Sequence, residues 1–110
     1  MEIENNAKLL VETLTRRGER LTCAESLTGG LVAATIVGIP GASNTFFQGI
    51  VTYADQAKEQ MLDIPYSVIA KHGAISSRTA ELMACGAASK CSAHMALATT
   101  GNAGPSAAEG

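Results

Sequence analysis

Helical patterns alternate along this chain with short apolar segments, and this order constrains the fold more than any other feature of the sequence. Apolar residues at helical spacing predict an amphipathic helix over residues 3–17, and the apolar run at 21–25, bounded by polar turns, predicts a buried strand. The same reasoning predicts helices at 31–37, 55–61, 65–72 and 76–90, and strands at 46–53 and 93–99. This alternation predicts an α/β fold, a three-layer α/β/α sandwich with helices on both faces of a mainly parallel or mixed sheet.

The composition fits one globular domain that comprises residues 1–110. Hydrophobic residues make up 46% of the chain and charged residues 16%, with a net charge of −2, so an ordinary buried core is expected rather than disorder. Aromatic residues make up only 4%, so the core must consist of aliphatic and small side chains. Charges of both signs are scattered, which argues against a nucleic-acid partner.

Signals for targeting, metal binding and membrane insertion are not found in the sequence. The start Met-Glu-Ile-Glu has neither the basic nor the apolar region of a signal peptide, and the three cysteines form no Cys-x-x-Cys pair, so a cytoplasmic protein is expected. His72 and His94 lack partners at metal-ligand spacing, so no metal or other cofactor is expected. The longest uncharged stretch, residues 26–54, contains polar residues throughout and predicts no membrane span.

Three loops that combine hydroxyl groups with glycines lie at predicted strand ends, at residues 25–30, 41–43 and 100–105. Parallel α/β sheets bind ligands at the carboxyl ends of their strands, so the first and third loops are expected to face one pocket. Residues 28–30 open a helix, whose unpaired N–H groups can hold a phosphate, although such turns also simply cap helices. The loop lacks the Gly-Lys-Ser/Thr ending of a P-loop.

A tyrosine and a lysine follow the second predicted strand. Tyr53 ends that strand, and Lys58 comes one helical turn later, so both can reach a cleft. A partly desolvated lysine loses its proton more easily, which suits a general base beside a hydroxyl nucleophile. The alternative is an ordinary lysine on the solvent face of the helix, since lysines are mostly exposed.

Six motifs occur along the chain in a fixed order. They are Ala-Glu-Ser-Leu-Thr-Gly-Gly at 24–30, Pro-Gly-Ala-Ser at 40–43, Gly-Ile-Val-Thr-Tyr at 49–53, Ala-Lys at 57–58, His-Gly-Ala-Ile-Ser at 72–76 and Thr-Gly-Asn-Ala-Gly-Pro at 100–105. In order and spacing they resemble the CinA C-terminal domain family, which includes the nicotinamide mononucleotide deamidases. The resemblance runs from about residue 5 to residue 105.

The resemblance implies metal-independent hydrolysis of the carboxamide of nicotinamide mononucleotide, which gives nicotinate mononucleotide and ammonia. It matches Ser43 to the family's proposed nucleophile and Lys58 to its general base, with Tyr53 beside them. The residues that would contact the nucleotide substrate are Ser26, Thr28, Gly29, Gly30, Thr100 and Gly101. One cleft is expected to bring together the side chains of Ser26, Ser43, Tyr53, Lys58 and Thr100.

The chain departs from the family pattern at its end. After Gly-Pro the family continues into further strands, a final helix and an arginine of the site, whereas this sequence ends at residue 110. The domain is therefore expected to be incomplete, and an open sheet edge favours a homodimer. The alternative to an active amidohydrolase is a nucleotide-binding or accessory module that keeps the fold without turnover.

Overall fold

The computed structural model describes residues 2–102, which contain every helix and strand expected from the sequence. The elements are α1 (Glu2–Arg17), β1 (Leu21–Glu25), α2 (Leu31–Val37), the short 3₁₀ helix η1 (Ala42–Asn44), β2 (Phe46–Val51), α3 (Asp55–Leu62), α4 (Tyr66–His72), α5 (Ser77–Cys91) and β3 (Met95–Thr99). The helix η1 is not among the predicted elements, and helix bounds differ from the predictions by at most one residue. Two strands differ more: the second ends at residue 51 instead of 53, and the third begins at 95 instead of 93.

The three strands form one parallel sheet in the order β2-β1-β3. All five residues of the central strand β1 are buried, which explains its apolar sequence. The last residue of β1, Glu25, pairs with Val51 of β2 and with Thr99 of β3, so the three carboxyl ends are in register. The segments that follow these strands are therefore brought together at one edge of the sheet.

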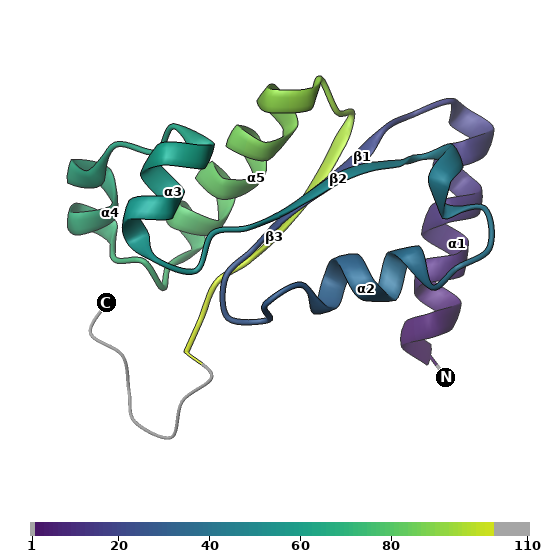
Figure 1. The fold of residues 1–110 in the computed structure, drawn as a ribbon, viewed down its shortest axis with the longest axis horizontal. Coiled ribbons are helices and arrows are strands. Elements are labelled where there is room, and N and C mark those ends of the chain that lie inside the picture. The colour runs from purple at the N-terminus through teal and green to yellow at the C-terminus, as the bar shows by residue number, and fades with distance from the viewer. Residues whose placement is uncertain (1, 103–110) are drawn as a thin grey trace.

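Helices cover both faces of the sheet, as Figure 1 shows, with α1 and α2 on one face and α3, α4 and α5 on the other. Side chains alternate along β1 between the two layers. Leu21 packs in a cluster with Val11 of α1 and Ile36 of α2, whereas Ala24 packs in a second cluster with Met83 of α5. The predicted three-layer α/β/α sandwich is confirmed.

The sheet has two open edges within residues 2–102, one at β2 and one at β3. On β3, Met95 and Leu97 are each 38% exposed, more than buried core residues would be. In the part of the chain that the structure describes, no helix combines the length and apolar character that crossing a membrane requires.

Candidate active site

Lys58 is buried at the carboxyl edge of the sheet, although it carries an ionisable amine. Its side chain is only 1% exposed, and its Nζ donates to the main-chain oxygens of Thr52, at 2.9 Å, and Tyr53, at 3.0 Å. A third contact, 3.2 Å long, joins Nζ to the hydroxyl oxygen of Ser26. The alternative of a solvent-facing lysine is therefore wrong, because α3 turns this residue inward over the strand ends.

Burial makes the Lys58 amine easier to deprotonate than the amine of an exposed lysine. Burial lowers the pKa of the Lys58 amine, and the Asp55 carboxylate, 3.9 Å from Nζ, opposes this in part. A neutral amine has two N–H bonds and one lone pair, and two carbonyl oxygens lie within hydrogen-bond distance. In the structure Nζ donates to Ser26 Oγ, and the Ser26 hydroxyl donates to the main-chain oxygen of Tyr53 at 3.4 Å. Once the amine has lost a proton and its two N–H bonds are directed at the carbonyls, its lone pair faces Ser26 Oγ, and the hydroxyl must turn from Tyr53 to donate to it.

Ser26 lies directly after β1 and is held by the ends of both neighbouring strands. Its side chain is buried, its N–H donates to the main-chain oxygen of Thr99 at 3.1 Å, and its Oγ lies 3.4 Å from the main-chain oxygen of Tyr53. Because parallel strands bring their carboxyl ends to one edge, residues distant in sequence form one compact site. The Ser26–Lys58 pair is thus built from the ends of β1 and β2, with support from β3.

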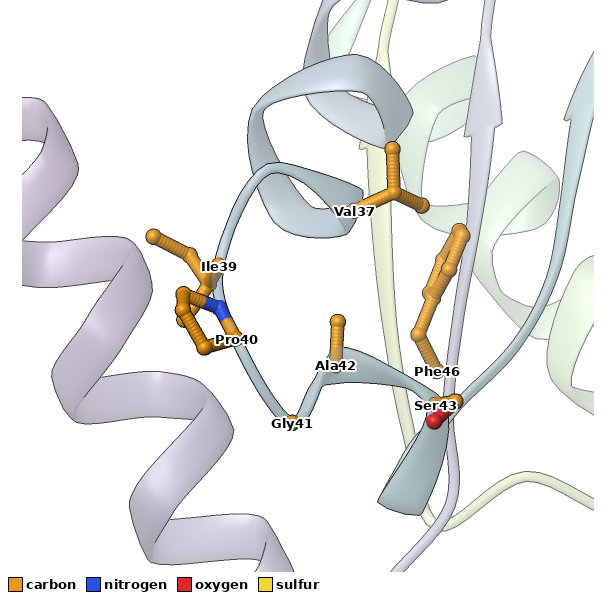
Figure 2. A pocket seen from close by; sticks show the side chains of 7 residues that line it. All are labelled: Val37, Ile39, Pro40, Gly41, Ala42, Ser43 and Phe46. Atoms are coloured by element: carbon orange, nitrogen blue, oxygen red, sulfur yellow. The ribbon is translucent and has the colours of Figure 1, made fainter.

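Ser43, the nucleophile expected from the resemblance, lies at the other end of β2 from Lys58. It belongs to η1, which precedes β2, whereas α3 follows the strand; the six residues of β2 span about 17 Å at ~3.3 Å per residue. Figure 2 shows Ser43 at a cavity of about 430 Å³ whose other lining side chains, Val37, Ile39, Pro40, Ala42 and Phe46, are apolar. The expected pairing of Ser43 with Lys58 is therefore wrong for this structure, because the hydroxyl beside Lys58 belongs to Ser26.

Tyr53 contributes its backbone to the site and not its ring. The main-chain oxygen of Tyr53 accepts from Lys58 and from Ser26, whereas the residue is 73% exposed. A catalytic role for the phenol beside Lys58 is therefore not supported by this geometry, because the ring projects into solvent.

Thr100 and Gly101 follow β3 and lie beside the first loop. The hydroxyl of Thr100 donates to the main-chain oxygen of Ala74 at 2.6 Å, which ties the end of β3 to the turn between α4 and α5. A Cβ added at Gly101 would lie 3.2 Å from the side chain of Leu27, so glycine permits this close approach. The end of this motif, residues 103–105, lies outside the described residues.

The turn formed by Thr28, Gly29 and Gly30 is occupied by a carboxylate of the chain itself. Gly29 and Gly30 have positive φ values of 62° and 110°, which fold the chain back over the strand end. The N–H groups of Val32 and Ala33, in the first turn of α2, donate to Glu25 at 2.8 and 2.9 Å. The prediction that these helix N–H groups hold a phosphate is therefore wrong, since a buried anion already uses them.

Glu25 is the residue of this site that sequence reasoning missed. The sequence places Glu25 in a buried strand and predicts no role for its side chain. In the structure its carboxylate caps the N-terminus of α2 from five residues before Gly30, which offers no side-chain cap. No local sequence signal marks this role, because a capping side chain is ordinarily sought at the N-cap position itself, which is Gly30. Within residues 2–102, no three His, Cys, Asp or Glu side chains are grouped as metal ligands would be.

The fold and this geometry define a class of protein: a three-layer α/β protein with a serine–lysine pair at the carboxyl edge of its parallel sheet, where proteins of this architecture bind their ligands. Comparison with known proteins identifies the family within that class. The chain belongs to the CinA C-terminal domain family, whose model matches residues 3–110.

Curated relatives share close to half of their aligned residues with this chain. A putative competence-damage inducible protein of Limosilactobacillus reuteri (strain DSM 20016) is 48% identical over 104 residues, which are 94% of this chain and 25% of that protein. A CinA-like protein of Chloroherpeton thalassium is 46% identical over 94 residues, 86% of this chain and 22% of the relative. The chain therefore spans about a quarter of the length of these relatives.

Solved structures of the family have the same fold. The competence/damage inducible protein CihA of Agrobacterium tumefaciens superposes with a TM-score of 0.94 at 38% identity, covering 99% of this chain and 66% of the other. A competence-damaged protein (CinA) superfamily protein of Escherichia coli superposes with a TM-score of 0.93 at 34% identity, covering 97% and 62%. Nearly the whole chain thus corresponds to about two thirds of each neighbour.

Proposed function

We propose that this domain is an amidohydrolase that converts nicotinamide mononucleotide to nicotinate mononucleotide and ammonia, with Ser26 as nucleophile and Lys58 as general base. The observation that carries the proposal is the contact of 3.2 Å between Lys58 Nζ and Ser26 Oγ at the carboxyl edge of the sheet. The choice of substrate follows from the resemblance to the nicotinamide mononucleotide deamidases. The site chemistry is compatible with it, because a hydroxyl activated by an amine attacks a carboxamide without a metal.

The proposed reaction has two stages. Neutral Lys58 accepts the proton of Ser26 as Oγ attacks the carboxamide carbon, and the resulting ammonium returns that proton to the leaving nitrogen, so that ammonia departs and an ester to Ser26 remains. Water then attacks the ester carbon, with Lys58 accepting a proton from water and returning it to Ser26. The products are the regenerated hydroxyl and a carboxylic acid, which releases its proton to solvent and becomes the carboxylate.

Exchange of each serine for alanine tests which hydroxyl is the nucleophile. Ser26→Ala should reduce ammonia release by at least about a hundredfold, since it removes the group that the base activates, whereas Ser43→Ala should change it less than about threefold. A coupled ammonia assay on the purified proteins measures both. A loss in Ser43→Ala together with full activity in Ser26→Ala would exclude the proposed site. Nucleotide binding without any ammonia release would instead identify an accessory module.

Asp55→Asn should move the acid limb of the pH–rate profile to lower pH. Burial lowers the pKa of Lys58, and the Asp55 carboxylate opposes this by favouring the ammonium form, so removal of that charge lowers the pKa further. The neutral amine is the active form, so the rate rises with pH as Lys58 loses its proton. kcat/KM should be measured against pH at low salt, because Asp55 is exposed and salt screens its charge.

The control for this profile is Asp63→Asn. The carboxylate of Asp63 pairs with Lys90 at 2.7 Å, so this variant loses the same charge without altering the contact to Lys58. An acid limb that stays in place or moves to higher pH in Asp55→Asn would contradict the assignment of Lys58 as the titrating base.

A further inference from the structure

The carboxylate of Glu25, the residue directly before the proposed nucleophile Ser26, is buried, and both of its oxygens accept hydrogen bonds. Oε1 accepts from Thr28 Oγ1 at 2.5 Å and from the N–H of Val32 at 2.8 Å, while Oε2 accepts from the N–H of Ala33 at 2.9 Å and from Cys23 Sγ at 3.7 Å. Glu25 is 1% exposed, and none of the ion pairs among the described residues includes it. Neutral donors alone therefore stabilise this buried charge.

The environment of Glu25 favours its ionised form. Burial raises the pKa of the Glu25 carboxyl, but the hydrogen bonds from Thr28, Ala33, Val32 and Cys23 outweigh burial and lower the pKa below its ordinary value. An ionised carboxylate only accepts hydrogen bonds, so the single proton of the Thr28 hydroxyl is directed at Glu25.

This fixes the direction of a hydrogen-bond chain that leads to Ser26. Thr28 Oγ1 also lies 2.9 Å from Thr99 Oγ1, and because its own proton is already committed, Thr99 is the donor in that contact. The proton of Thr99 is then committed as well, so its hydroxyl oxygen accepts from the N–H of Ser26 at 3.4 Å, in addition to the shorter bond of 3.1 Å from the same N–H to the main-chain oxygen of Thr99. The chain runs from the Ser26 N–H through Thr99 and Thr28 to the buried anion.

We propose that Glu25 is the positioning residue of the site: its carboxylate orders the two threonine hydroxyls that hold the backbone of Ser26, and thereby keeps Ser26 Oγ opposite Lys58 Nζ. The proposal rests on the proposed function, because it takes Ser26 as the nucleophile. Glu25 acts through other residues and does not touch the reacting atoms.

Helix α2 depends on the same carboxylate. Glu25 therefore holds the turn that carries Ser26 in two ways, through the hydroxyl of Thr28 and through the first N–H groups of α2. The helix has seven residues and begins after Gly30, which provides no side-chain cap, and helices of this length are marginal by themselves. Glu25 supplies an anion at its N-terminus, and the main-chain oxygen of Ser26 accepts from the N–H of Gly29 in the intervening turn. Loss of the hydrogen bonds to Glu25 should therefore loosen the turn that carries Ser26.

The test measures the reactivity of Ser26 itself. Phenylmethanesulfonyl fluoride reacts with an activated serine: Oγ forms a bond to sulfur, fluoride leaves, and Lys58 accepts the hydroxyl proton before passing it to solvent. Peptide mass spectrometry against time gives the rate at Ser26. Thr28→Val removes one hydroxyl at nearly constant shape and should slow this reaction by about 10–100-fold, the effect of roughly 1 Å of misplacement. Glu25→Gln should slow it to a similar extent.

Matched variants separate positioning from general destabilisation. Thr28→Ser retains the hydroxyl and should restore the rate to within about threefold of the parent protein. Thr35→Val removes a hydroxyl of α2 that donates to the main-chain oxygen of Leu31 in its own helix, and it should leave the rate unchanged. Equal rates in the parent protein and Thr28→Val, or no recovery in Thr28→Ser, would overturn the role of Glu25. A parent protein in which Ser26 does not react at all would overturn the proposed function itself.

Discussion

Lys58→Met should reduce ammonia release from nicotinamide mononucleotide by about 10²–10⁴-fold, the contribution that a positioned general base makes. Methionine keeps much of the buried volume of lysine but has no amine to accept the proton of Ser26, which lies 3.2 Å from Nζ in the parent protein. The rate is measured with the coupled ammonia assay at saturating substrate, and unchanged turnover would eliminate Lys58 as the base.

The double variant Ser26→Ala with Lys58→Met sharpens this result. Residues that act as one unit are not additive, so the double variant should be nearly as active as the slower single variant. Losses that multiply would show that the two side chains act independently.

Folding must be measured in the Lys58→Met variants, because the amine also has a structural role. It donates to the main-chain oxygens of Thr52 and Tyr53; the oxygen of Tyr53 also accepts from Ser26, but a buried acceptor such as the oxygen of Thr52 costs about 1–3 kcal/mol when it is left without a partner. Removal of a buried amine offsets part of this cost. Thermal unfolding of each variant therefore sets the temperature at which activities are compared.

The order of elements follows directly from local sequence signals. The helical spacing of apolar residues in α1, the apolar run of β1 and the Ser76 cap of α5 each act within a few residues of the chain, and all three are present as expected. Strand ends are less well determined, because pairing with a neighbour decides them: the second strand ends at Val51, where its last partner, Glu25 of β1, also ends.

The serine of the site could not be identified from local signals alone, because Ser26 and Ser43 both lie in loops with glycines. The topology distinguishes them. Ser43 precedes β2 and Lys58 follows it, so a strand length separates the two, whereas Ser26 follows β1 and reaches the edge where Lys58 lies. Consistent use of the rule that ligands bind at carboxyl ends would have favoured Ser26.

The burial of Lys58 and the role of Glu25 depend on packing that a linear pattern does not contain. Most lysines are exposed, and the sequence around residue 58 has no feature that marks it as buried; the inward direction results from how closely α3 packs on α5. Glu25 is likewise recognised only when Val32 and Ala33 are seen to donate to it.

The close packing of α3 on α5 depends on Gly86, and Gly86→Ala should lower the free energy of unfolding by about 1–3 kcal/mol. A Cβ at this position of α5 would lie 2.4 Å from the main-chain oxygen of Leu62 and 3.0 Å from its Cβ. Alanine is favoured over glycine within a helix by about 1 kcal/mol, but this overlap involves the backbone of another helix, which cannot rotate away. The overlap therefore determines the sign of the effect.

Gly38→Ala is the matched control, since a Cβ there would lie 3.5 Å from its nearest neighbours and the residue has a right-handed φ of −71°. The same substitution should be neutral or stabilise the domain by up to about 1 kcal/mol. Urea unfolding of both variants measures the difference, and a Gly86→Ala protein as stable as Gly38→Ala would contradict the packing described here. Because Leu62 lies one helical turn after Lys58 on α3, displacement of Leu62 should disturb the contact of 3.2 Å between the amine and Ser26, so any folded Gly86→Ala protein should release ammonia more slowly than the parent.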